Sequence, residues 1–423
     1  MRLTILHTND IHGREERIAQ IATIVRRVKE ASPHRVLYLD AGDVEETTNH
    51  LSSVTKGTAM HRLLSLTTCD AATVGNACWL RYGPGVLADH ARAASYPLLL
   101  ANFTGIDGPV PSVLLDGVGV FGLTAPFQGM ANDVDWGFER VDILETAKQC
   151  ARDLRERGAE IVVLLSHLGL DDPNEPWDDR SLAPQLRGLV DVVIGAHTHD
   201  VLPDGEAIGG VLVAQAGSHG DHIGRIEIDD DTISARVERV PEDTRPHPAI
   251  ADEAATIARE VEEMLAEPLG EIDAPLDAGF IAEVLRERMD AEVGLFSEGQ
   301  TLGVLGPGPL TRGMLWRISD SPANPGVTRM TGAQLSDLIA RGNAPEMQSD
   351  TPSPLRGRRR GRLAVAGLTE FEPERRYLVA GTDWELEPYG GYALPQWKLA
   401  VSYDFPIIVR EAVEEHLRGL SAG

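Results

Sequence analysis

Two aspartates, one asparagine and four histidines stand just after short apolar runs in the first half of the chain. In chain order they are Asp10 and His12 after run 3–7, Asp43 after run 36–39, Asn76 after run 71–74, His167 after run 161–165, and His197 and His199 after run 190–194. Carboxylate and imidazole groups are ligands of borderline divalent metals such as Mn²⁺, Zn²⁺ and Fe²⁺. Ligands of open α/β sheets gather at the carboxyl ends of strands, so we expect these side chains to share one site.

The size of this set indicates more than one metal ion. Seven ligands are too many for a single tetrahedral ion, and they suit two ions that share a bridging carboxylate, roughly 3.5–4 Å apart. Such a pair supplies a hydroxide nucleophile near neutral pH and clamps the oxygens of a phosphoryl group. Each residue alone would be interpreted as an ordinary polar residue at a strand end, but the ordered set argues against that. We therefore expect two divalent metal ions (Mn, Zn or Fe) and a small phosphorylated molecule as substrate.

The apolar runs are short and β-branched, which is typical of buried strands. A further run covers 210–213, and helical patterns lie between the runs, for example at 18–29 and 146–157. Segment 226–240 alternates more strictly and predicts late antiparallel strands. The first half is therefore expected to be α/β.

The composition and the hydrophobic pattern of the sequence change after residue 240, which predicts a second domain. The chain has 423 residues, which is comfortable for two domains. Segment 241–248 is rich in proline and charge, and a helical pattern follows over 249–266, opened by Pro248 and stopped by Pro268. We expect domains at 1–243 and 269–423 joined by a linker helix within 244–268. The second domain is a smaller α/β unit, with helices near 278–288, 332–340 and 408–417 and a strand near 292–296.

Composition excludes several classes of protein. Hydrophobic residues make up 42% and charged residues 25% of the chain, with a net charge of −26, which excludes a general nucleic-acid binder and argues against anionic membranes. No apolar run approaches the ~20 residues of a membrane span, and the first residues do not form a secretory signal. Three dispersed cysteines do not make a disulfide framework. We expect a cytoplasmic protein without nucleic-acid or membrane partners, and its oligomeric state stays open.

The motifs at the strand ends carry a family resemblance. They are Leu6-His7-Thr8-Asn9-Asp10-Ile11-His12-Gly13, Gly42-Asp43, Gly75-Asn76, Ser166-His167-Leu168-Gly169 and Gly195-Ala196-His197-Thr198-His199. The second half adds Met330-Thr331-Gly332-Ala333-Gln334-Leu335 and Tyr389-Gly390-Gly391-Tyr392. Over essentially its whole length the chain resembles the 5′-nucleotidase branch of the calcineurin-like metallophosphoesterases, most closely the short cytoplasmic bacterial members.

The resemblance implies a fold and a ligand assignment. The fold is a four-layer α/β/β/α sandwich with a smaller C-terminal α/β domain that selects the substrate. One metal would be held by Asp10, His12, Asp43 and His199. The other would be held by Asp43, Asn76, His167 and His197, with Asp43 as the bridge.

The chain departs from the family where a histidine usually follows the asparagine ligand. That position is Ala77, which can neither donate a proton nor stabilise charge, and no acidic partner follows it. A positioned acid or base typically contributes ~10²–10⁴-fold in rate, and its loss matters least when the leaving group is a stable phosphate. We therefore expect a preference for nucleotide sugars or other pyrophosphates. Arg81, His219 or His222 are candidates to replace the histidine, although both histidines also fit solvated loop positions. Cys78 fits a small buried hydrophobe better than a ligand.

The second domain departs from the family as well. The segment 296–303 lacks the arginine that family nucleotidases use there, and it carries Glu298. The basic run 356–362, including Arg356, is a candidate anion-binding segment or an exposed loop. Tyr389 and, less favourably, Trp384 are candidates for stacking on a substrate base, although aromatic residues more often pack in a core.

Together these observations predict hydrolysis of a phosphoester or phosphoanhydride, with a nucleotide or nucleotide sugar as substrate. Two alternatives remain open. One is a ligand-binding protein that keeps the metals but has weakened turnover because of Ala77. The other is a hydrolase of a non-phosphate ester.

Overall fold

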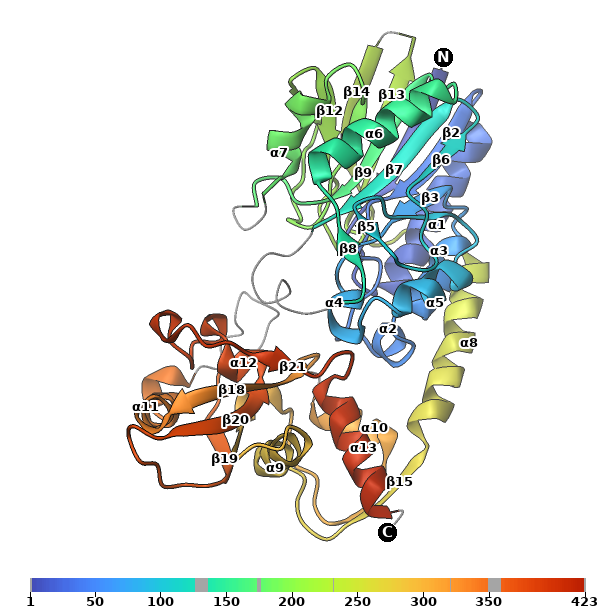
Figure 1. Cartoon of the computed structure of the whole chain (residues 1–423). Helices are drawn as coiled ribbons and strands as arrows, with labels where there is room; N and C mark the ends of the chain where they lie inside the picture. The colour runs from blue at the N-terminus through green and yellow to red at the C-terminus, as the bar shows by residue number, and fades with distance from the viewer. Residues whose placement is uncertain are drawn as a thin grey trace. The chain divides into compact units, whose positions relative to one another are not determined.

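The chain folds into two compact units, Met1–Arg259 and Glu260–Gly423 (Figure 1). The computed structural model describes residues 2–125, 136–172, 176–230, 232–319, 321–348 and 359–421. The division falls inside helix α8 (Pro248–Leu265), at the position where the proline-opened helix was expected. Each unit has its own sheets and its own apolar core.

The first sheet of the N-terminal unit holds six strands. Their order is β14 (Thr232–Arg239), β13 (His222–Asp229), β1 (Arg2–Thr8), β2 (Arg35–Asp40), β3 (Ala71–Thr73) and β4 (Leu98–Leu99). Strands β1 to β4 run parallel, whereas β13 and β14 are antiparallel, as the alternation over 226–240 predicted. The carboxyl ends of β1, β2 and β3 therefore lie at one edge of this sheet.

A second six-stranded sheet packs against the first. Its order is β11 (Glu206–Ile208), β12 (Val211–Ala214), β10 (Val192–Ile194), β9 (Ile161–His167), β7 (Val118–Thr124) and β6 (Ser112–Leu115). Strands β7, β9, β10 and β12 are parallel. The strands expected at 161–165, 190–194 and 210–213 are confirmed here, and β7, which is buried along its whole length, was missed.

Helices cover the outer faces, so the unit has helices, sheet, sheet and helix as its layers. Helix α6 (Ile143–Glu156) packs on the second sheet, and α1 (Glu15–Ala31) and α3 (Thr58–Ser65) lie on the side of the first sheet (Figure 1). The core between the sheets is made of aliphatic side chains, including Leu3, Ile5, Leu37, Leu39, Val120, Val163, Leu165 and Ile194. The layered α/β sandwich implied by the resemblance is confirmed.

The two sheets approach closely at Gly122 of β7. A Cβ atom at this position would lie 2.4 Å from Thr73 Oγ1 and 2.7 Å from Leu99 Cβ. Only glycine permits this approach. This close approach of the two sheets brings the carboxyl ends of β3 and β9 into one region of the unit.

The second unit contains one five-stranded sheet. Its order is β19 (Leu363–Gly367), β16 (Val293–Ser297), β20 (Arg376–Thr382), β18 (Pro325–Thr331) and β21 (Ser402–Tyr403), and β15 (Pro268–Ile272) pairs with β17 (Gly308–Thr311). The helices are α9 (Ala278–Arg288), α10 (Arg312–Ile318), α11 (Gly332–Gly342), α12 (Asp383–Leu386) and α13 (Val409–Ser421). The predicted α/β character and the three predicted helices are confirmed. Among the described residues, no helix combines the length and the apolar character that a bilayer crossing needs.

Candidate metal centre

The structure brings all seven predicted ligands together, but from two sheets and not from one sheet edge. Asp10 and His12 follow β1, Asp43 follows β2 and Asn76 follows β3, all in the first sheet. His167 ends β9, and His197 and His199 follow β10 in the second sheet. The site therefore lies where the carboxyl ends of two packed sheets meet.

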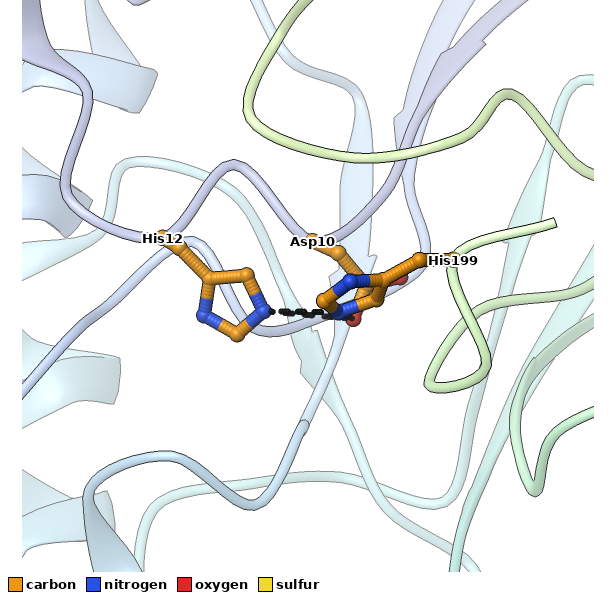
Figure 2. Close-up of side chains that lie close together, drawn as sticks. All are labelled: Asp10, His12 and His199. Atoms are coloured by element: carbon orange, nitrogen blue, oxygen red, sulfur yellow. Dashed lines mark hydrogen bonds and ion pairs between the residues drawn. The ribbon is translucent and has the colours of Figure 1, made fainter. Parts of the chain in front are cut away.

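One cluster consists of Asp10, His12 and His199. His12 Nε2 lies 3.0 Å from His199 Nε2, and Asp10 Oδ1 lies 3.7 Å from His12 Nε2 and 3.5 Å from His199 Nε2. Figure 2 shows the three side chains converging on one point. All three ligand atoms fall within 4.8 Å of one another, a spacing at which one ion contacts all of them.

A second cluster consists of Asp10, Asp43 and His167. His167 Nε2 lies 3.3 Å from Asp43 Oδ2 and 3.9 Å from Asp10 Oδ1. Asn76 Oδ1 extends this cluster, at 3.1 Å from His167 Nε2 and 3.0 Å from His197 Nδ1. Asp10 belongs to both clusters in this geometry, and the bridging role implied for Asp43 stays a prediction.

Asp10 carries an oxygen whose surroundings fit a cation. Its Oδ2 accepts hydrogen bonds from Asn9 Nδ2 at 2.7 Å and from the His197 amide at 3.0 Å. Its Oδ1 is fully buried, and no hydrogen-bond partner is assigned to it among the residues that the structure describes. A buried carboxylate oxygen without a partner is costly. A divalent ion shared with the surrounding imidazoles would satisfy it.

The histidines are oriented by partners at their other ring nitrogens. His167 Nδ1 lies 2.9 Å from the Ala41 carbonyl, so it carries the hydrogen and leaves Nε2 for an ion. His12 Nδ1 lies 3.5 Å from Glu46 Oε2, and His197 Nε2 lies 3.3 Å from Asp172 Oδ2. Metal-binding histidines typically have such partners. Glu46 and Asp172 were not predicted from the sequence, and their only signal is an acidic residue a few positions after a ligand.

The backbone around the clusters is unusual. Six non-glycine residues of the site have positive φ: Asp10 (51°), His12 (50°), Asp43 (55°), His197 (73°), His199 (62°) and His219 (56°). Such conformations cost energy and concentrate at functional sites. The loops after β1 and β2 hold one another in this form, because the amides of Asp10 and His12 donate to the carbonyls of Gly42 and Asp43, each at 2.9 Å.

Asp43 is fixed by the chain that follows β3. Its Oδ1 accepts hydrogen bonds from the amides of Asn76 and Ala77, at 2.5 and 2.8 Å. A Cβ atom at Gly75 would lie 2.0 Å from the same oxygen. The Gly75-Asn76 motif therefore supplies a ligand and also leaves room for the neighbouring ligand.

The electrostatics of the site favour positive charge. Burial lowers the pKa of His167, but the carboxylates of Asp43 and Asp10 outweigh this and raise it to about 10. Burial raises the pKa of Asp10, but the surrounding histidines His199, His167 and His12 hold it well below its usual value. A buried pocket whose carboxylates outweigh burial in stabilising positive charge fits divalent ions.

The position of the missing family histidine lies beside these clusters. Ala77 is half-buried, and its amide contacts Asp43. Cys78 is buried, as expected, and burial raises the pKa of its thiol. Arg81 is buried in α4 (Trp79–Tyr82), and His222 begins β13.

His219 is the candidate replacement that the structure places at the clusters. Its ring centroid lies 5.6 Å from that of His12 and 5.7 Å from that of His199. Its amide donates to the Asp10 carbonyl at 2.7 Å. It is half-exposed and borders a cavity of about 660 Å³ whose lining includes Arg14, Arg17 and Asn49.

The predicted substrate residues in the second unit have different outcomes. Trp384 is 0% exposed and packs in the core beside Tyr392, so its assignment as a base-stacking residue is corrected to core packing. Tyr389 is half-buried beside the turn at Gly391, which has φ 84°. Arg360 of the basic run donates to the Gly390 carbonyl at 2.9 Å. Arg356 lies outside the described residues.

Comparisons with known proteins agree with this geometry. Residues 3–201 match the family described as calcineurin-like phosphoesterases. The uncharacterized metallophosphoesterase YunD of Bacillus subtilis (strain 168) is 27% identical over 405 residues, which cover 88% of this chain and 85% of that protein. The trifunctional nucleotide phosphoesterase YfkN of the same strain is 25% identical over 410 residues, which cover 80% of this chain but 27% of that protein.

A solved structure supports the fold at lower identity. The 5′-nucleotidase precursor from Thermus thermophilus aligns with a TM-score of 0.60 and 20% identity, and the alignment covers 99% of this chain and 97% of that chain. At this identity the likeness shows a shared two-domain fold.

Proposed function

Residues 3–201 belong to the calcineurin-like phosphoesterases, and from that premise we propose that the protein hydrolyses nucleotide phosphoanhydrides, such as nucleotide sugars, in preference to simple 5′-monophosphates. Metal-dependent phosphoester hydrolysis follows from the family and from 5′-nucleotidase relatives. The choice among substrates is the proposal, and it depends on one residue position, Ala77.

The chemistry requires two divalent ions, for which seven side chains are proposed as ligands. They are Asp10, His12, Asp43, Asn76, His167, His197 and His199. Bound ions would lower the pKa of a water molecule and neutralise charge on the phosphoryl group. The protein's own contribution is to hold the carboxylates in left-handed backbone conformations and to direct the imidazole nitrogens inward.

The leaving group determines how much the side chain at position 77 matters. Ala77 lies beside Asp43 with a methyl group that cannot donate a proton. A nucleoside alkoxide is a poor leaving group that needs protonation, whereas a departing phosphate is stable without it. A positioned acid typically contributes ~10²–10⁴-fold, so its absence slows monoester hydrolysis far more than anhydride hydrolysis.

Other residues are proposed to contact the substrate. Arg14 lines the cavity that His219 borders, and its positive charge suits phosphate oxygens, whereas Arg17 in the same lining is paired with Asp221 at 2.9 Å. Tyr389 remains the candidate for stacking on a base, and the Arg360 contact at the adjoining turn places a cation beside it.

The test is phosphate or nucleotide release by the full chain loaded with Mn²⁺, across nucleotide sugars, dinucleotide pyrophosphates and 5′-monophosphates. The variant Ala77→His restores the family residue, and Asp43→Asn is the inactive control. We expect turnover that favours anhydrides, is lost in Asp43→Asn, and shifts towards monoesters in Ala77→His. Monophosphate turnover equal to or above anhydride turnover in the unmodified chain would overturn the preference.

The assay also separates the alternative functions. An absence of turnover with metals bound would indicate a ligand-binding protein. Turnover of sulfur esters without turnover of any phosphate compound would indicate a hydrolase of non-phosphate esters.

A further inference from the structure

Glu45, His61 and His90 form a second group of ligand-type side chains in the N-terminal unit. Glu45 lies in the loop after β2, His61 lies on α3, and His90 lies on α5 (Val86–Ala93). They are 6%, 2% and 0% exposed, respectively. Charged and imidazole side chains are rarely buried together unless they are paired or bind a metal, so the contacts among them decide which applies.

Their spacing matches that of the predicted ligands described above. Glu45 Oε1 lies 2.7 Å from His61 Nε2 and 3.1 Å from His90 Nδ1. The two imidazole rings are 4.5 Å apart between centroids. All three ligand atoms thus face one point inside the protein, as Asp10, His12 and His199 do.

The contacts of His90 leave one ring nitrogen, Nδ1, facing the Glu45 carboxylate. Its Nε2 lies 2.6 Å from the Lys56 carbonyl, and because a carbonyl can only accept, Nε2 must carry the hydrogen. In a neutral imidazole the other nitrogen, Nδ1, then presents a lone pair. That Nδ1 is buried, no hydrogen-bond partner is assigned to it among the described residues, and an oxygen of Glu45 lies 3.1 Å away. Two facing buried acceptors repel one another, and either a proton or a metal ion between them removes the conflict.

His61 has the second contact that a metal-binding histidine typically has. Its Nε2 faces Glu45, and its Nδ1 lies 2.8 Å from Tyr96 Oη. Both histidines therefore pair one ring nitrogen with an oxygen of the protein and direct the other towards Glu45, the arrangement that orients imidazole ligands around metals. Burial also lowers the pKa of His61, which favours its neutral, ligating form.

A glycine allows these elements to approach. Gly57 precedes α3 with φ 91°, and a Cβ atom there would lie 2.6 Å from His90 Nε2 and 2.9 Å from Glu45 Cγ. Any other residue at position 57 would separate the loop, α3 and α5. The closely packed backbone thus keeps the three side chains within reach of one ion.

We propose that Glu45, His61 and His90 bind a further divalent cation, of the Zn²⁺ type, separate from the ions of the candidate metal centre. Two imidazoles and one carboxylate are a donor set that Zn²⁺ accepts, with a remaining position for water or the second Glu45 oxygen. The ion is structural. It joins α3 and α5 to the loop that carries Asp43, two residues before Glu45.

The test counts zinc ions in full chains in which two proposed ligands of the candidate metal centre have been replaced. The background variant Asp10→Asn/His167→Gln disables the candidate metal centre and leaves the buried group intact. After loading with Zn²⁺ and dialysis into metal-free buffer, elemental analysis should find one zinc per chain. Cobalt substituted into the same variant should give the intense visible bands of a four-coordinate site.

Two further variants identify the ligands. Adding His90→Gln to the background should reduce zinc to zero and remove the cobalt bands, whereas adding the surface change His50→Gln should alter neither. Far-ultraviolet circular dichroism checks that each variant is folded. If His90→Gln does not fold, Glu45→Gln in the same background takes its place.

The proposal is overturned if the folded background variant retains no zinc, because the space between Glu45 and His90 then holds a proton. It is also overturned if His90→Gln or Glu45→Gln, when folded, leaves the zinc content and the cobalt spectrum unchanged. None of these measurements uses turnover, so the result is independent of the substrate proposal.

Discussion

Replacing Gly75 by alanine tests whether Asp43 is held in place by the backbone after β3. A Cβ atom at position 75 would lie 2.0 Å from Asp43 Oδ1 and 2.3 Å from the Asp43 amide nitrogen. Real Cβ contacts stay beyond 3.0 Å, so the carboxylate or its backbone must shift by about 1 Å. A displacement of this size at a reacting centre costs on the order of 10²-fold in rate.

The shift should also weaken the hydrogen bonds that Asp43 Oδ1 accepts from Asn76 and Ala77. We therefore expect Gly75→Ala to lower kcat/KM by about 10²-fold and to lower the number of metal ions bound per chain. The measurements are hydrolysis of the best substrate at saturating Mn²⁺ and elemental analysis after dialysis.

Gly85→Ala is the matched control. Gly85 has φ −58° and nothing within 4 Å of its Cβ position, so an added methyl group strains nothing. This variant should keep normal activity and gain about 0.4–1 kcal/mol of stability through its less flexible unfolded state. If Gly75→Ala matches Gly85→Ala in turnover and metal content, the steric account of the Asp43 position is wrong.

Three further outcomes follow from the structure. Gly122→Ala should lower the free energy of unfolding by about 1–3 kcal/mol, because its methyl group would meet Thr73 and Leu99 between the sheets; an unchanged denaturant midpoint would contradict this. Burial raises the pKa of Asp179 to about 8, although Ser166 donates a hydrogen bond to it. The folded state therefore binds this proton more tightly than the unfolded state does. As a result, the free energy of unfolding falls as pH rises from about 4 to about 8. From pH 5 to pH 8, the free energy of unfolding should therefore fall less in Asp179→Asn than in the unmodified chain, and equal decreases would refute the assignment. Dialysis against a chelator should abolish turnover and Mn²⁺ or Zn²⁺ should restore it, whereas activity that persists after verified metal removal would argue against metal dependence.

The strand ends were predictable because their chemistry is local. An apolar run followed by Asp, Asn or His can be recognised without a partner, and β1, β2 and β9 follow that pattern. Strand β7 was missed because Gly119 and Gly122 interrupt its apolar pattern and resemble turn residues. In the structure these glycines serve close packing, since a Cβ atom at Gly119 would lie 2.9 Å from Leu154 Cβ.

The parts of the site that depend on distant packing were not predictable in this way. His219 reaches the clusters only because β12 and β13 carry its loop to the Asp10 carbonyl. Trp384 lies where the resemblance suggests a base-stacking aromatic residue, yet the apolar core of the second unit buries it. The group of Glu45, His61 and His90 has no sequence spacing that marks it, because three separate elements supply its members. Its one signal is a histidine on the apolar face of α3, between Met60 and Leu63.

The pairing of β1 with β13 determines how short a functional fragment can be. Strand β1, which leads to Asp10 and His12, pairs with β2 along one edge. Along its other edge it pairs with β13, more than 200 residues later in the chain, with Arg2 opposite Asp229. A fragment that stops at residue 201, where the family match ends, would leave β1 as an unprotected edge strand. Unpaired apolar edges recruit other chains and aggregate. During synthesis, Asp10 and His12 emerge long before β13, so β1 cannot be paired on both edges until β13 has been made. Long-range strand pairing of this kind forms slowly, and it precedes completion of the metal centre.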